Sequence, residues 1–396
     1  METKQSFFEG KFGRFMLPGI VLQSVLIGGG YATGREIVEY GAKFGAIGWL
    51  AGLGTFLAFA VVAVLSFELI RLYKVYDYKS FIKEIGGPLW MVFDVVYFLF
   101  MVVIIAVMAS ATGSIVEQTL GLNYWTGVVA ITVVVGILNF FGEHLIERFE
   151  TYGTIVLYAG YIIFAALVIS KNYGNMQQVF TTGDTSFVPT AAAPAVLWSG
   201  VLYCAYNLVV VPSAFFTIKR QTKRSEAVIS GIIGGVLATV PWFMTYFAVM
   251  CFYPQEEVLG ATVPWLAMMQ GVAGPVVIGI FGVIMGWTLI ETSTGIIHAA
   301  IERVNNGLKE MNKNAMTRPQ QAAVTLVILI GALALSKVGI IDLIATVYNG
   351  LAYVFLAIYV VPLLTVGIYK ISKKRREETA GNEEKTAVEP KKAAHA

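Results

Sequence analysis

The chain has 396 residues, of which 57% are hydrophobic and 13% are charged, and its mean hydropathy is +0.72. Soluble domains carry about 25% charged residues, so this composition excludes a soluble globular protein and indicates a membrane protein with many spans. The formal net charge of +3 gives no indication of a nucleic-acid partner, and none is expected. The two cysteines, Cys204 and Cys251, lie in apolar runs without metal-ligand spacing.

Ten stretches are long and apolar enough to cross a bilayer, which requires about 20 apolar residues. They predict an all-α integral membrane protein with ten transmembrane helices at 15–40, 46–72, 88–117, 124–141, 152–170, 194–218, 227–252, 272–302, 320–335 and 340–369. Residues 1–12 form a short N-terminal segment, and residues 173–193 are expected to form an extracellular loop. The charged, alanine-rich segment 371–396 is expected to be a disordered tail.

Lysine and arginine residues predict how the chain is oriented in the membrane, because cytoplasmic loops carry an excess of them. With the N-terminus in the cytoplasm, every cytoplasmic segment but one holds several basic residues. The opposite segments hold only Lys43, Lys171 and Lys337. Both termini are therefore expected on the cytoplasmic side.

The first span is interrupted by Gly28, Gly29, Gly30 and Gly34, and a charged pair follows directly. A glycine costs about 1 kcal/mol relative to alanine within a helix. Charge is also expensive where it faces lipid. Two interpretations follow: an unwound helix centre that offers backbone groups to a small ligand, or a small-residue face that packs on a neighbouring helix.

The sixth span is interrupted as well. Tyr206 and Asn207 lie in its middle, and Pro212 removes a backbone donor and clashes with the preceding turn. An ordinary proline kink is the alternative. The two interruptions lie five spans apart, so residues 13–172 and 194–370 are expected to be two five-helix repeats of inverted topology. Paired interruptions at corresponding positions in two halves are typical of a transporter binding site.

A short motif in the first span resembles that of a known family. The run from Gly28 to Ile37 is similar to the G-A-G-F-A-S/T-G-x-E-I pattern of the bacterial YkvI-like membrane proteins, with Gly29 in place of alanine and Tyr31 in place of phenylalanine. More broadly, residues 12–370 resemble the amino acid–polyamine–organocation superfamily, which has the LeuT-type inverted repeat of five plus five helices. The resemblance implies a bacterial cytoplasmic membrane protein that transports amino acids or related small solutes, driven by Na⁺ or H⁺.

A substrate site is expected where the two interrupted spans meet. The backbone N–H groups of the first break would bind a carboxylate, because they lie at the positive end of a half-helix. The candidates in the first span are Gly28, Gly29, Gly30, Tyr31, Ala32 and Thr33. In the sixth span, Tyr203, Tyr206 and Asn207 would contact an amine or a side chain, although the tyrosines are also plausible packing residues.

A Na⁺ site is implied by the LeuT-type resemblance, in which hydroxyl groups of span eight and carbonyl groups of span one hold the ion. Thr292 and Ser293 fit that pattern, with Thr294 as an alternative register. The carbonyls near Ile27 and Gly30 would complete the oxygen shell. Alternatively, these hydroxyls bond carbonyls of their own helix. No other cofactor is expected.

Two carboxyl groups are candidates for proton or ion coupling, because an ionisable group inside a membrane span usually has a function. Glu291 lies deepest in span eight, and Glu36 follows the first break. A structural hydrogen bond to a neighbouring helix is the alternative role for Glu291.

Charged residues near the span ends are candidate gates. Arg35 and Asp342 would form an outer pair, unless Arg35 pairs with Glu39 on its own helix. Arg14 and Glu302 would form the matching inner pair.

The function expected from these features is secondary active transport of a small amino-acid-like solute by alternating access. The alternative is a sensor or accessory subunit of the same fold that binds a solute without net transport. An enzyme is not expected, because no HExxH motif, histidine cluster or serine–histidine pair lies at membrane depth. The partners expected are the small solute and the lipid bilayer.

Overall fold

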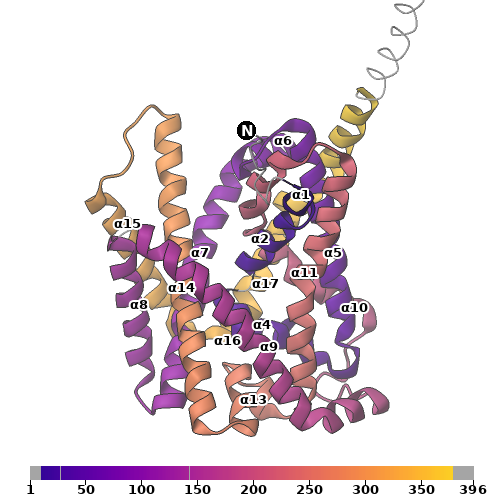
Figure 1. The fold of residues 1–396 in the computed structure, drawn as a ribbon, viewed down its shortest axis with the longest axis vertical. Coiled ribbons are helices and arrows are strands. Elements are labelled where there is room, and N and C mark those ends of the chain that lie inside the picture. The colour runs from indigo at the N-terminus through magenta and orange to yellow at the C-terminus, as the bar shows by residue number, and fades with distance from the viewer. Residues whose placement is uncertain (1–9, 27, 142, 378–396) are drawn as a thin grey trace, which may run out of the picture.

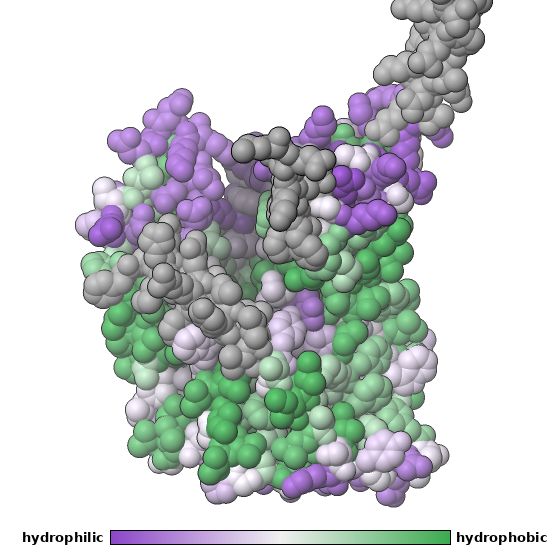
Figure 2. All heavy atoms as spheres, viewed as in Figure 1, coloured by the Kyte–Doolittle hydropathy of each residue, from purple (hydrophilic) through white to green (hydrophobic). Residues whose placement is uncertain are grey.

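The computed structural model describes residues 10–26, 28–141 and 143–377, and every regular element in these ranges is a helix. The helices form one upright bundle, with α6 (Tyr78–Gly86) at one end and α13 (Pro264–Val272) at the other (Figure 1). We call these the α6 end and the α13 end. Hydrophobic residues cover the middle of the visible surface and hydrophilic residues gather at both ends (Figure 2), as expected for a bundle that spans a bilayer.

Six helices within the described ranges are long and apolar enough to cross a membrane, or seven if one bent pair counts as a span. They are α5 (Trp49–Tyr73), α7 (Leu89–Leu120), α11 (Arg224–Met250), α14 (Pro275–Glu310), α15 (Arg318–Leu335) and the C-terminal run Ile340–Glu377. The expectation of an all-α, multi-pass membrane protein is therefore confirmed. The count of ten spans stays a prediction, although α8 (Tyr124–Phe141) and α9 (Glu143–Thr182) coincide with two further predicted spans.

Two helices extend further than the sequence indicates. α9 continues to Thr182, with non-helical backbone angles at Asn172, so it occupies half of the segment expected to be a loop. The C-terminal run remains helical as far as Glu377, beyond the predicted start of the disordered tail at residue 371. The rest of that tail, like residues 1–9, lies outside the described residues.

The first predicted span is a series of short helices. α2 (Leu17–Leu26) precedes the glycines, α3 (Gly29–Ala32) contains two of them, and α4 (Arg35–Tyr40) follows. Gly34 separates α3 from α4 with a φ of 84°, a left-handed conformation that side chains rarely adopt. The glycine at this position therefore lets the chain change direction where a continuous helix would otherwise run.

The sixth predicted span consists of two helices, α10 (Ala193–Asn207) and η3 (Val211–Arg220), which are bent by 72° relative to each other. Pro212 lies in the first turn of η3, where a proline fits because its missing N–H would have no helical partner. The helix before the bend ends at Asn207, one of the two polar residues noted in the sequence.

Packing brings the two interrupted segments together. α5 packs against both α10 and α11, and α11 also packs against α2. On the other side, the short α3 packs against α7 and α14. The breaks in the first and sixth segments are thus enclosed by long helices.

Candidate functional site

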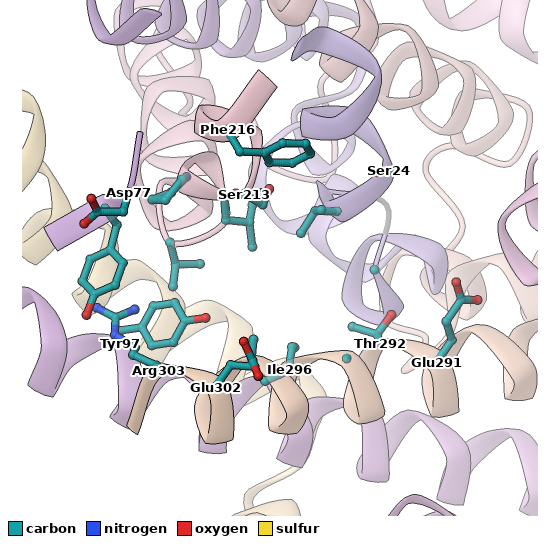
Figure 3. Close-up of a pocket in the computed structure, with 18 of the residues that line it drawn as sticks. Ser24, Asp77, Tyr97, Ser213, Phe216, Glu291, Thr292, Ile296, Glu302 and Arg303 are labelled. Carbon is teal, nitrogen blue, oxygen red and sulfur yellow. Dashed lines mark hydrogen bonds between the residues drawn. The ribbon is translucent and has the colours of Figure 1, made fainter. Parts of the chain in front are cut away.

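A cavity of about 840 Å³ lies in the α6 half of the bundle. One wall is a single face of α14, which contributes residues three or four positions apart, as helical geometry requires. Figure 3 shows Glu291, Thr292, Ile296, Glu302 and Arg303 along this wall. Figure 3 also shows the opposite wall, where Ser24 of α2 lies beside Ser213 and Phe216 of η3. The large cavity therefore separates α14 from both interrupted segments.

A second cavity, of about 50 Å³, continues from the first into the centre of the bundle. Six residues line both cavities: Val25, Gly28, Val209, Val210, Thr292 and Ile296. The small cavity is also lined by Gly30, Tyr31, Glu36, Phe100, Tyr206, Asn207 and Tyr348. It thus lies where the first break, the α10–η3 bend, α7, α14 and η5 (Leu343–Tyr348) meet.

Among the described residues that line this small cavity, Glu36 supplies the carboxyl group. Only 6% of the residue is exposed, and the Tyr206 hydroxyl donates a hydrogen bond of 2.6 Å to Oε2 of its carboxylate. Oε1 faces the first break so closely that a Cβ atom added to Gly30 would lie 2.1 Å from it. A glycine is therefore required at position 30 for the carboxylate to occupy this position.

Aromatic rings surround the carboxylate. The Tyr206 ring lies 4.9 Å from Tyr348, 5.3 Å from Tyr40 and 5.4 Å from Tyr203, measured between ring centroids. Phe100 completes the group, with its centroid 4.9 Å from that of Tyr348. These rings come from α4, α7, α10 and η5, so the packing of four elements creates this environment.

Two tyrosine hydroxyls near Glu36 have unfulfilled hydrogen-bonding capacity. The hydroxyl groups of Tyr31 and Tyr40 are buried and have no hydrogen-bond partner among the described residues. A buried polar group without a partner costs about 1–3 kcal/mol. Since Tyr31 also lines the small cavity, a ligand in that cavity is the natural partner for its hydroxyl.

The structure brings together five of the nine residues predicted to bind substrate. Gly28, Gly30, Tyr31, Tyr206 and Asn207 line the small cavity. Ala32, Thr33 and Tyr203 line neither cavity. The Thr33 hydroxyl donates to the Gly30 carbonyl at 2.7 Å and stabilises the local turn, and Tyr203 packs among the aromatic rings.

The hydroxyls proposed for Na⁺ point in different directions. Thr292 faces the first break, because a Cβ atom added to Gly28 would lie 3.0 Å from its methyl group. Ser293 and Thr294 are buried, and each donates to a carbonyl of its own helix, at 2.8 Å and 2.7 Å. They follow the alternative bonding pattern considered for them. Ile27 lies outside the described residues, and the part of the chain that is described contains no cluster of three His, Cys, Asp or Glu residues suited to a metal.

In this structure Arg35 has the alternative partner considered for it, Glu39, and not Asp342. Arg35 is buried and binds Glu39 at 3.1 Å, whereas Asp342 is exposed and lines a separate cavity. The Arg35 guanidinium also donates to the carbonyls of Leu259, at 2.6 Å, and Ala261. The loop after α12 (Glu256–Leu259) supplies these carbonyls and so takes the place expected for Asp342.

Residues 256–272 cover the α13 end of the site. Besides the contacts of Arg35, the Trp265 backbone N–H donates to the Thr33 carbonyl at 3.1 Å, and its indole N–H donates to the Tyr161 hydroxyl at 2.7 Å. The small cavity is therefore capped by α12 and α13, while the large cavity lies on its other side. The sequence indicates no role for these residues, which lie between two predicted spans. α12 and α13 are short and carry no distinctive motif that could have identified them.

Arg14 does not pair with Glu302 in this structure. Arg14 binds Glu226 at 3.1 Å, while Glu302 lines the large cavity. Glu226 also accepts hydrogen bonds from the backbone N–H groups of Thr222 and Lys223, at 2.7 Å and 3.0 Å, and so caps the start of α11. The Glu226 carboxylate therefore both caps the first turn of α11 and pairs with Arg14.

We expect Glu226→Ala to lower the thermal stability of the purified protein, because it removes the helix cap and the contact to Arg14. Loss of a cap costs about 1 kcal/mol, which corresponds to roughly 2–4 °C in Tm for a domain of 150–250 residues and less for a longer chain. Glu302→Ala is the matched control and should leave the Tm unchanged. An equal loss of stability in both variants would contradict the Arg14–Glu226 pairing.

Comparisons with known proteins agree with this architecture. No family model matches the chain. The membrane protein YkvI of Bacillus subtilis strain 168, described as uncharacterized, is 23% identical over 241 residues. The match covers 56% of this chain and 62% of YkvI, which is less than two thirds of that relative. The chain is a weak homologue of YkvI, and the resemblance to the YkvI-like membrane proteins is confirmed.

Solved structures of several transporters have a similar fold. A Na⁺-coupled sialic acid symporter in a substrate-bound, outward-open state is 15% identical, with a TM-score of 0.60, over 93% of this chain and 82% of its own. MhsT in complex with L-phenylalanine is 13% identical, with a TM-score of 0.61, over 90% and 92%. A manganese transporter of Eremococcus coleocola is 12% identical, with a TM-score of 0.57, over 92% and 81%. These neighbours are LeuT-fold transporters, and at such low identity the likeness shows the fold alone.

Proposed function

We propose that this protein is a secondary active transporter of a small amino-acid-like solute, coupled to Na⁺ or H⁺. In this proposal ten transmembrane helices form two inverted repeats of five, and the first and sixth are broken at mid-membrane. The observation that carries the proposal is the pair of connected cavities that ends at both breaks and at Glu36. A LeuT-type carrier needs such a path from one membrane face to a central site.

The proposal also assigns a conformation. We place the α6 end in the cytoplasm, because Arg14, Lys79 and Arg303 lie on segments predicted to be cytoplasmic. The large cavity then opens inward, and the contacts of Arg35 and Trp265 close the outward side. Alternating access would require these contacts to break while the walls of the large cavity close.

The roles of individual residues follow from their positions. Gly28, Gly30, Tyr31, Tyr206 and Asn207 would contact the solute, and Glu36 would supply the charge of the site. If Na⁺ is the coupling ion, Thr292 and the carbonyls of the first break would hold it, since Thr292 is the hydroxyl that faces the break. Glu291 lines the large cavity and is the second candidate for coupling.

We expect gradient-driven accumulation in proteoliposomes that contain the purified protein. Radiolabelled amino acids and related solutes are offered one at a time, with an inward Na⁺ gradient or an inward proton gradient imposed separately. A coupled carrier concentrates its solute only under the correct gradient, and accumulation collapses when an ionophore removes that gradient. Binding without any gradient-dependent accumulation would favour the alternative, a solute-binding sensor of the same fold.

A further inference from the structure

The break in the first segment already contains a carboxylate that belongs to the chain itself. Oε1 of Glu36 lies against the backbone of Gly30, where the sequence alone predicts the carboxylate of a bound solute. A second carboxylate in the same buried space would be repelled, because like charges interact strongly when water is excluded. The anionic position of this site is therefore taken, and the space beside it favours a positive charge.

The remaining walls of the small cavity also suit a cation. Tyr31, Phe100, Tyr206 and Tyr348 line it, and the faces of aromatic rings attract ammonium groups. The Tyr31 residue is only 1% exposed, and its hydroxyl has no partner within the described part of the chain. An ammonium group supplies three N–H donors, enough to serve the Glu36 carboxylate and the Tyr31 hydroxyl together.

The lining of the large cavity, between the small cavity and the α6 end, also favours positive charge. Among the described residues that line it, Asp77 and Glu302 are carboxylates besides Glu291, and Arg303 is basic. The Arg303 charge is offset by Asp94, which accepts a hydrogen bond of 2.7 Å from its Nε. A lining with an excess of one sign of charge concentrates ions of the opposite sign, so the carboxylates of Asp77 and Glu302 favour a cationic solute on the way to Glu36.

The sizes of the two cavities indicate which part of the solute each would hold, a small head group in one and the rest of the molecule in the other. A cavity of about 50 Å³ has room for roughly four water-sized spheres, which suits an ammonium head with one or two attached carbons. The remainder of the solute would extend past Thr292 into the cavity of about 840 Å³.

We infer that the solute is an organic amine cation without an α-carboxylate, held by its ammonium group between Glu36 and the rings of Tyr31, Tyr206 and Tyr348. This inference rests on the proposed transport function and narrows its substrate class. Glu36 takes the place of the carboxylate that an amino acid would bring, so decarboxylated amines are preferred over their parent amino acids.

The test compares amines with the amino acids from which they derive. Full-length protein in lipid nanodiscs is titrated with three pairs, isobutylamine and valine, phenethylamine and phenylalanine, and cadaverine and lysine, while its thermal unfolding is followed. Isovalerate serves as the anionic control. We expect at least one amine to raise the Tm saturably with an apparent affinity at least tenfold above that of its parent, because the α-carboxylate of the parent is repelled by Glu36 and a difference of about 1.4 kcal/mol is tenfold in affinity.

Substitutions of Glu36 test whether its carboxylate causes the preference for amines. Glu36→Gln should weaken amine binding by about tenfold to a hundredfold, whereas Glu36→Asp, which keeps the charge, should retain part of the affinity. Glu117→Gln removes an exposed carboxylate of α7 and should bind the amine as the unchanged protein does. If Glu36→Gln does not fold, the ratio of amine to parent affinity in the unchanged protein still decides the outcome.

Three results would overturn the inference: no amine stabilises the protein, a parent amino acid binds as tightly as its amine, or Glu36→Gln binds amines unchanged. A loss of Na⁺-dependent stabilisation in Glu36→Gln, with the amine preference intact, would likewise assign Glu36 to the ion and overturn it. Failure of the proposed transport is separate, since it would appear as amine-selective binding without gradient-driven accumulation in proteoliposomes.

Discussion

Gly30→Ala is expected to reduce gradient-driven uptake by about tenfold or more. The new Cβ atom would lie 2.1 Å from Oε1 of Glu36, so the carboxylate must move from the position in which its Oε2 accepts the hydrogen bond of Tyr206. A hydrogen bond to a charged group contributes about 1.5–3 kcal/mol, which corresponds to a factor of roughly 10 to 100 in affinity. The measurement is uptake into proteoliposomes of the solute that the transport screen identifies.

Two further variants show whether the loss comes from this contact. Gly279→Ala on α14 is the matched control, because an added Cβ atom at that position meets nothing within 4 Å, and it should transport normally. The double variant Gly30→Ala with Glu36→Asp shortens the carboxylate side chain by one methylene group and should recover part of the uptake. Normal uptake by Gly30→Ala itself would show that the position of Glu36 is unimportant.

Arg35→Gln is expected to open the α13 end of the site. The substitution removes the ionic contact to Glu39 and weakens the bonds to the Leu259 and Ala261 carbonyls, which hold the loop after α12 over the first segment. Loss of a buried, charge-assisted bond costs about 1.5–3 kcal/mol, enough to change the ratio of two conformations by tenfold or more. The outward-open population should increase accordingly, and coupled uptake should fall.

Cysteine labelling measures this opening directly. The two native cysteines are buried and are first replaced by alanine, and Thr292→Cys then places a thiol between the two cavities. In sealed vesicles an impermeant thiol reagent added at the α13 end should label position 292 slowly in the parent and at least tenfold faster with Arg35→Gln. Asp342→Asn is the comparison, because Asp342 makes no contact with Arg35, and it should leave the rate unchanged. Equal acceleration by both substitutions would restore the predicted Arg35–Asp342 pair.

Those parts of the fold that depend on local chemistry are predictable from the sequence. Gly28, Gly30 and Gly34 weaken a helix wherever they occur, and Pro212 removes a backbone donor regardless of its surroundings. Both interruptions therefore appear in the sequence, and the residues beside them, Tyr206 and Asn207, line the small cavity as expected.

The partners of charged residues are not predictable in the same way. Arg14 pairs with Glu226 across 212 positions of sequence, and Arg35 reaches carbonyls more than 220 positions away. Backbone carbonyls carry no sequence signal at all, since every residue has one. A prediction that matches charged side chains with each other therefore overlooks Leu259 and Ala261.

The aromatic lining was missed for a related reason. Phe100 and Tyr348 lie in long apolar runs, where an aromatic residue that faces lipid and one that faces a cavity look alike. Likewise, the rotation of α14 about its axis decides that Thr292 faces the break while Ser293 and Thr294 bond their own helix. A shift of one residue on a helix turns a side chain by about 100°, and tertiary packing alone determines that angle.

Arg35 and Glu36 are neighbours on α4, a helix of only six residues. One side chain holds the cap at the α13 end, and the other lines the small cavity. Because the two residues are adjacent, any displacement of α4 that moves Glu36 also changes the position of Arg35 relative to the carbonyls of the cap. Occupancy of the site and closure of the cap are thereby linked through a single peptide bond, with no need for a longer chain of contacts.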